Sequence, residues 1–113
     1  MKYIIAVIQP DKIEEVLEAL DDEAIHLVTA SDVMGRGKQK GVAEIYRSHV
    51  EPGNLLRKVK LEIAVNDDFL TPAITTIARV ARTGNIGDGK IFVLDLEQCV
   101  RIRTGETGSV AIG

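Results

Sequence analysis

Three short segments of the 113-residue chain place glycine beside lysine or arginine, each at the end of a hydrophobic run. They are residues 35–41 (GRGKQKG), 87–90 (GDGK) and 101–106 (RIRTGE). Glycine lets a backbone approach an oxyanion without a Cβ in the way, successive loop N–H groups can form an anion-binding nest, and lysine or arginine supplies charge. Together the segments predict a phosphate-binding site. None is specific alone, because none has the spacing of the dinucleotide fingerprint or of a Walker A loop.

The pair Arg101 and Arg103 adds information through its spacing. In an extended strand, the period of two places both guanidinium groups on one face. Two such groups side by side suit a polyphosphate, whereas the alternative is a surface ion pair with a nearby carboxylate such as Glu106. Cations that converge without a counter-anion are costly. If Lys58 and Lys90 lie at the same edge, the expected ligand is a nucleoside triphosphate.

Hydrophobic runs predict the strands that must position these segments. Runs of strand length are found at residues 3–8, 25–33, 59–65 and 91–96. The second run includes His26, which we expect to be a strand residue with no catalytic part.

Two helical patterns separate these strands. Apolar residues recur at helical spacing from 13 to 20, with Asp11 as the expected N-cap and Glu14 as its capping-box partner. Residues 66–68 are expected to cap a second helix, whose apolar stripe runs from 70 to 81.

The chain thus has the order strand–helix–strand twice. Two βαβ units with right-handed crossovers build a ferredoxin-like α+β sandwich, with one antiparallel sheet and both helices on one face. Lys60 and Glu62 make the other face partly polar, and self-association is the simplest way to cover it. We expect a single domain over residues 1–113 that forms a homo-oligomer.

Two parts of the chain lie outside this double pattern. Residues 36–57 show neither period and form a long loop between the second and third strands, which is typical of a functional loop. Residues 98–113 form a C-terminal loop and tail.

Composition argues against several classes of protein. A formal charge of −3 and a pI near 5.4 argue against a general nucleic-acid binder. No apolar run is long enough to span a membrane, so we expect a cytoplasmic protein without membrane insertion. The only cysteine, Cys99, is expected to be a buried, inert thiol. Neither His26 nor His49 lies near a compelling nucleophile, so catalysis is the weaker hypothesis.

These motifs resemble the P-II family of nitrogen-regulatory signal-transduction proteins over essentially the whole chain. The most specific matches are residues 87–93 (GDGKIFV) and 101–106, with support from Gln39, Lys40, Gly41, Glu44, Tyr46, Arg47, Lys58, Val59, Lys60 and Glu62. The resemblance implies a ferredoxin-like homotrimer with three inter-subunit clefts that bind ATP or ADP competitively. It further implies that ATP with Mg²⁺ creates a 2-oxoglutarate site at the base of residues 36–57, the T-loop.

The resemblance also implies roles for individual residues. The residues that would hold phosphates are Gly87, Asp88, Gly89, Lys90, Arg101 and Arg103. Thr29 and Glu62 would lie near the base, and Gly35, Arg36, Gly37 and Lys38 would form the hinge of the T-loop. Gln39 would ligate Mg²⁺, and Lys58 would pair with a 2-oxoglutarate carboxylate. The T-loop residues that would contact a partner protein are Arg47, Ser48, His49 and Glu51.

Departures from the family pattern are concentrated in the T-loop. Relatives commonly carry an aromatic residue and an arginine where this chain has Arg36 and Lys38, and lysine lacks the planar fork of arginine. Glu51 stands where a uridylylated tyrosine is often found, which makes that modification impossible here.

The preferred function is a P-II-type sensor that regulates an enzyme or a membrane transporter of nitrogen metabolism through its T-loop. The alternatives are a paralogue with a different target and effector, or a slow nucleotide hydrolase.

Overall fold

The computed structural model describes residues 1–37 and 55–113 of the chain. Its strands are β1 (Lys2–Ile8), β2 (Thr29–Gly35), β3 (Leu56–Val65) and β4 (Lys90–Asp95). Its helices are α1 (Ile13–Asp22), α3 (Leu70–Ala81) and the short α4 (Ser109–Ile112), with 3₁₀ turns η1 (Pro10–Lys12) and η3 (Asp67–Phe69).

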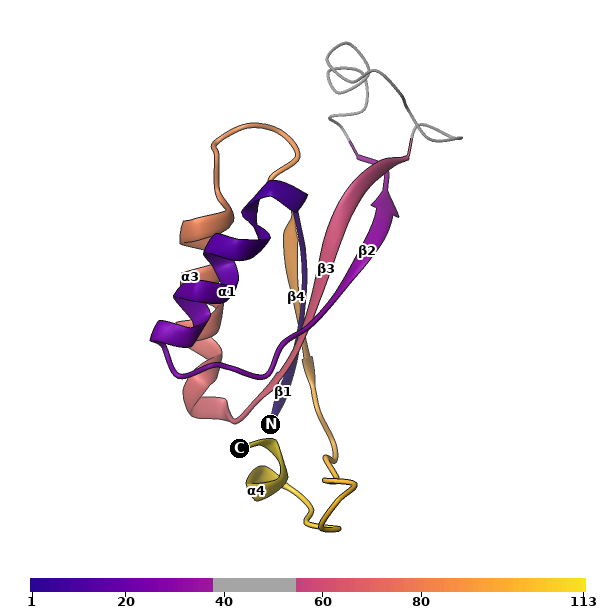
Figure 1. The fold of residues 1–113 in the computed structure, drawn as a ribbon. Coiled ribbons are helices and arrows are strands. Elements are labelled where there is room, and N and C mark those ends of the chain that lie inside the picture. The colour runs from indigo at the N-terminus through magenta and orange to yellow at the C-terminus, as the bar shows by residue number, and fades with distance from the viewer. Residues whose placement is uncertain (38–54) are drawn as a thin grey trace.

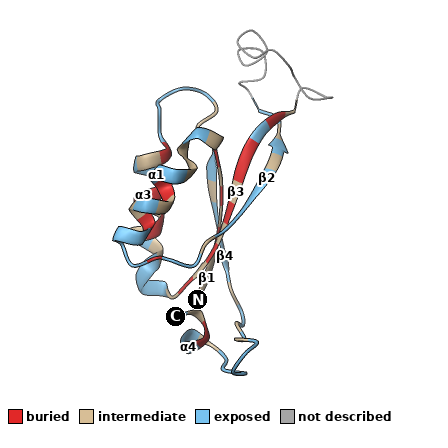
Figure 2. Cartoon of the chain, in the orientation of Figure 1, coloured by how far each residue is buried: buried red, intermediate tan, exposed pale blue. Residues whose placement is uncertain are grey.

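The four strands form one antiparallel sheet in the order β2-β3-β1-β4, and α1 and α3 cover the same face of it (Figure 1). This arrangement is the predicted ferredoxin-like double βαβ fold. The alternation of side-chain direction along the two central strands explains why the helices cover one face, because every second side chain of β1 and β3 points to the helices. The side chains buried in this layer include Ile4, Ala6, Ile8, Leu61, Ile63, Val16, Leu20 and Ile77, and Figure 2 shows the buried residues gathered there.

The starts of both long helices differ from the prediction. Each helix is entered through a 3₁₀ turn, and no side chain caps η1, η3, α1 or α3. Asp11 and residues 66–68 are therefore not caps, and Glu14 has no capping-box partner. Asp67 instead accepts from the amino group of Met1 at 3.0 Å. Pairing with the chain terminus competes successfully with capping because it joins two full charges.

Strand β2 begins four residues later than predicted, because α1 ends in a Schellman motif. The N–H of Ala24 donates to the carbonyl of Asp21 (3.0 Å), and the N–H of Ile25 donates to that of Leu20 (2.9 Å). His26 consequently lies in the connection that follows, not in a strand, where its Nδ1 lies 2.8 Å from a carboxylate oxygen of Asp21.

The Schellman motif carries a residue that is poorly suited to it. Ala24 has φ of 60°, the left-handed conformation that normally takes glycine at this position. We expect Ala24→Gly to raise the free energy of unfolding by about 1 kcal/mol, because the strain of a Cβ in this conformation outweighs the greater freedom of unfolded glycine.

The same substitution inside α1 is the matched control for Ala24→Gly. Ala19 has helical neighbours on both sides, so Ala19→Gly should lower the free energy of unfolding by about 0.5–1 kcal/mol. Urea denaturation of both variants measures the two effects. Equal losses of stability in the two variants would contradict the assignment of strain to Ala24.

The sheet face opposite the helices retains large exposed apolar side chains. Phe92 and Leu94 of β4 are each 49% exposed, and they lie beside Ile5 and Tyr3 of β1 in the antiparallel register. In the C-terminal segment, Ile102 is 99% exposed. A single copy of the chain therefore leaves this surface uncovered.

Candidate functional site

Residues 82–89 connect α3 to β4, and hydrogen bonds to the side chain of Asp88 hold this loop in its conformation. The carboxylate of Asp88 accepts from the N–H groups of Thr83 (2.8 Å) and Gly84 (2.9 Å) and from the Thr83 hydroxyl. Gly84 has φ of 91°, which lets its N–H turn toward the carboxylate. Asp88, a predicted phosphate-site residue, thus organises its own loop through these hydrogen bonds.

These hydrogen bonds make the loop sensitive to acid. Burial raises the pKa of Asp88, but hydrogen bonds from the Thr83 hydroxyl and from the Gly84 and Thr83 N–H groups outweigh it, so the pKa lies below its ordinary value. A depressed pKa means that the loop is stabilised above the unfolded-state value of about 4 and that this stabilisation is lost as the pH falls through the folded-state value.

We therefore expect the amide signals of Thr83 and Gly84 in ¹H–¹⁵N spectra to titrate with a midpoint below the ordinary pKa of an aspartate carboxyl group. In Asp88→Asn this titration should be absent, since the side chain no longer ionises. A wild-type midpoint at or above the ordinary carboxyl value would contradict the prediction.

Close packing of the backbone just before β4 leaves room only for glycine at position 89. Its φ is 104°, and a Cβ built on it would lie 1.8 Å from the carbonyl oxygen of Val7. The loop backbone thus rests directly on β1. Lys90 follows as an exposed residue in register with Val7.

Lys58 joins two of the three predicted segments. It is 7% exposed, and its Nζ donates to the carbonyl of Gly87 at 3.2 Å. A Cβ built on Gly35 would lie 3.5 Å from Cγ of Lys58, so the lysine stem passes close to the end of β2. The end of β2 and the loop 82–89 accordingly lie at the same end of the sheet (Figure 1). Arg36 and Gly37 continue from β2 there and are exposed.

Thr29 and Glu62 are also brought together, because they are partners in the register of β2 and β3. Glu62 accepts from the Tyr3 hydroxyl and pairs with Lys60 at 3.1 Å. The bond from Tyr3, with that from Lys60, lowers the pKa of Glu62, and the same bond to Glu62 raises the pKa of Tyr3.

An open hollow of about 380 Å³ adjoins this group and is lined by Tyr3, Leu27, Val28, Thr29, Glu62, Ala64, Cys99, Ala111 and Ile112. Sequence reasoning did not single out Tyr3 or Cys99 as site residues. Tyr3 lies opposite Ala64 in the strand register, and only its side-chain hydroxyl reaches diagonally to Glu62. Cys99 is only partly buried, contrary to the prediction of a buried thiol, because it lines this open hollow.

The arginine segment lies at the opposite end of β4 (Figure 1). Residues 102–104 form a turn, closed by hydrogen bonds from Gly105 N–H to the Arg101 carbonyl (2.8 Å) and from Arg101 N–H to the Glu106 carbonyl (2.9 Å). The prediction that Arg101 and Arg103 share one face of an extended strand is therefore wrong. Gly105, with φ of 74°, allows this turn.

The two arginines have different surroundings. Arg101 pairs with Glu106 at 2.8 Å and donates to the carbonyls of Val110 (3.2 Å) and Gly113 (2.8 Å). Arg103 is exposed, and within residues 1–37 and 55–113 it makes no hydrogen bond or ion pair. The alternative of an ion pair with Glu106 is confirmed for Arg101 and not for Arg103.

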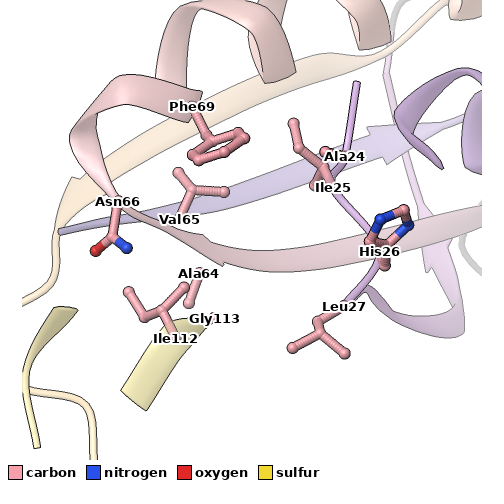
Figure 3. A pocket seen from close by; sticks show the side chains of 10 residues that line it. All are labelled: Ala24, Ile25, His26, Leu27, Ala64, Val65, Asn66, Phe69, Ile112 and Gly113. Carbon is pink, nitrogen blue, oxygen red and sulfur yellow. The ribbon is translucent and has the colours of Figure 1, made fainter. Parts of the chain in front are cut away.

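A second hollow, of about 150 Å³, lies between residues 24–27, the end of β3 and α4 (Figure 3). Apolar side chains such as Ile25, Phe69 and Ile112 form most of its wall. The described residues that line it include no lysine or arginine, so this hollow does not suit a phosphate.

Several predicted site residues lie outside the described residues. They are Lys38, Gln39, Arg47, Ser48, His49 and Glu51. The described ranges contain no cluster of three or more histidine, cysteine, aspartate or glutamate residues suited to a metal ion. None of the helices in these ranges combines the length and the apolar character needed to cross a membrane.

Comparison with known proteins decides the family. The model of the family described as "Nitrogen regulatory protein P-II" matches residues 1–106. The chain belongs to the P-II family.

Relatives of this P-II protein cover nearly its whole length. Nitrogen regulatory protein P-II 2 of Methanothermobacter thermautotrophicus is 47% identical over 99% of this chain and 97% of its own. GlnK1 of Methanosarcina mazei is 50% identical over 99% of this chain and 97% of its own. Among solved structures, Arabidopsis thaliana PII bound to citrate aligns with a TM-score of 0.79 and 40% identity, over 98% of this chain and 88% of that one. P-II proteins are nitrogen regulators rather than enzymes, in agreement with the prediction that this chain is not an enzyme.

Proposed function

We propose that this P-II protein binds ATP or ADP in clefts between the subunits of a homotrimer. The observation that carries the proposal is the separation of the predicted phosphate ligands. The loop 82–89 precedes β4 and the arginine turn follows it, and a six-residue strand spans about 20 Å. One chain therefore does not bring its own Arg103 to its own Lys90, whereas a neighbouring copy can supply the arginines.

Exposed apolar surface supports the assembly. Phe92 and Leu94 on the open sheet face, with Ile102 in the C-terminal turn, are the kind of side chains that a subunit interface buries. An interface there would cover the sheet and hold each C-terminal turn against the next subunit.

The regulatory part of the proposal concerns 2-oxoglutarate and the T-loop. With ATP and Mg²⁺ bound, Lys58 and Gln39 would hold a 2-oxoglutarate carboxylate and the metal ion respectively. The citrate bound to Arabidopsis PII is also a carboxylic acid, which supports an acid-binding capacity in this chain. The effectors would set the conformation of the T-loop and hence its affinity for an enzyme or transporter of nitrogen metabolism.

Calorimetry with ATP and ADP tests the nucleotide proposal, with light scattering to measure the subunit number. We expect binding in the micromolar range to the wild-type trimer and a large loss of affinity in Lys90→Ala, whose exposed side chain should leave the trimer intact. Absence of ATP and ADP binding to a wild-type trimer would contradict the proposal.

A separate titration tests the linkage to 2-oxoglutarate. ATP affinity is measured with Mg²⁺, with and without saturating 2-oxoglutarate. Two linked sites must raise or lower each other's affinity by the same factor. An unchanged ATP affinity would remove 2-oxoglutarate from the proposal and leave the nucleotide site standing.

A further inference from the structure

Lys58 occupies an unusual position for a lysine. Of the charged side chains in residues 1–37 and 55–113, it alone is buried, at 7% exposed. Charged groups rarely leave water unless polar partners replace it. One of its partners is the carbonyl of Gly87, 3.2 Å from Nζ and 29 positions away in the chain.

A bond to this carbonyl also orients the next N–H group. The peptide unit between Gly87 and Asp88 is planar and trans, so the Gly87 carbonyl and the Asp88 N–H point in opposite directions. Gly87 has φ of 106°, a conformation in which glycine has few intrinsic restraints. An external donor is therefore an effective way to select one orientation of this peptide unit.

The lysine also touches the base of the T-loop. Its stem passes close to Gly35, the last residue of β2, and Val33 is its register partner on that strand. The carboxylate of Asp88, immediately after the bonded peptide unit, holds Thr83 and Gly84. Lys58 thus forms a continuous connection from the end of β2 through β3 to the loop 82–89.

We propose that Lys58 is a positioning residue, which fixes the Gly87–Asp88 peptide unit so that the Asp88 N–H is presented to an anion and couples this loop to the base of the T-loop. The nature of that anion, a nucleotide phosphate, rests on the proposed function. The positioning itself does not, because it follows from the hydrogen bond between Lys58 and the Gly87 carbonyl.

The test compares Lys58→Met with Lys60→Met in the ligand-free, full-length protein. Methionine keeps most of the aliphatic stem but removes the ammonium group. Lys60 is the matched control, because it lies on the same face of the same strand and pairs with Glu62 rather than with the loop. Two quantities are measured by NMR, the ¹³C chemical shift of the Gly87 carbonyl and the hydrogen-exchange rates of the amides of residues 83–90.

We expect the Gly87 carbonyl signal to move and exchange in residues 83–90 to become about tenfold faster in Lys58→Met, with no change in α1. Lys60→Met should leave both quantities unchanged. Unaltered carbonyl shift and exchange in Lys58→Met, or equal changes in Lys60→Met, would overturn the proposal. If Lys58→Met does not fold, Lys58→Gln, whose shorter side chain remains polar, is used with the same criteria.

Nucleotide binding provides a second, separable measurement. ADP affinity, measured without 2-oxoglutarate, should be about tenfold weaker in Lys58→Met. Without the lysine, part of the binding free energy is used to order the loop 82–89. If wild-type protein binds no nucleotide, the proposed function fails, while the ligand-free measurement still decides the positioning role. If nucleotide binds equally well to wild type and Lys58→Met, the positioning role fails and the proposed function stands.

Discussion

Replacement of Gly89 by alanine is expected to lower the free energy of unfolding by about 3 kcal/mol or more. Two costs add in this variant. A Cβ is strained at φ of 104°, and it would lie 1.8 Å from the carbonyl oxygen of Val7, far inside van der Waals contact. Because that oxygen belongs to the backbone of the buried strand β1, it has little freedom to move.

Gly84→Ala in the same loop separates the two costs. Gly84 has φ of 91°, but a Cβ there would meet nothing within 4 Å. This variant should lose only about 1 kcal/mol, from backbone strain alone. Chemical denaturation of both variants gives the difference between them. Similar losses in the two would show that the contact with Val7 relaxes easily and would contradict the explanation given for Gly89.

The second large effect is expected at Arg103. Under the proposed function, Arg103→Ala should weaken ATP binding by about 10- to 100-fold, because a charge-assisted contact to phosphate is lost between subunits. Its exposed guanidinium makes no hydrogen bond or ion pair within the described part of the chain, so the variant should keep the wild-type free energy of unfolding and subunit number.

Arg101→Ala is the informative comparison. Arg101 holds Glu106 and the carbonyls of Val110 and Gly113, so its loss should also release the C-terminal segment. We expect faster hydrogen exchange over residues 105–113 in Arg101→Ala and unchanged exchange in Arg103→Ala. Normal ATP affinity in Arg103→Ala would argue against an inter-subunit phosphate contact, whatever the behaviour of Arg101→Ala.

Local periodicity was enough to predict the four strands, α1 and α3 and their order. It did not predict α4 (Ser109–Ile112), which lies in the segment expected to be a loop and tail. The run at residues 3–8 corresponds to β1, and the stripe from 70 to 81 coincides with α3. Short strands and amphipathic helices are encoded by side-chain alternation within a few residues, which a sequence displays directly.

The ends of helices and strands, and the residues that cap the helices, were less predictable, because several groups compete for the same hydrogen bonds and ion pairs. Asp67 is expected from the sequence to act in a helix cap. In the structure its carboxylate forms an ion pair with the amino group of Met1, which the sheet brings near. The run at 25–33 contains enough apolar and β-branched residues for an earlier strand, but the Schellman motif at Ala24 delays β2 to Thr29. Such outcomes depend on groups that are distant in sequence or on backbone conformations that residue type does not specify.

The sequence alone determined the fold class, the family and the residue types able to bind phosphate. The tertiary structure decided how those residues are used. It paired Lys58 with Gly87, assigned Asp88 to its own loop and placed Arg103 at the far end of β4 from Lys90. The physical reason is that the ability of glycine and cationic side chains to bind an anion can be recognised from residue type alone. Strand register and burial, in contrast, decide which group each of these residues contacts in the folded chain.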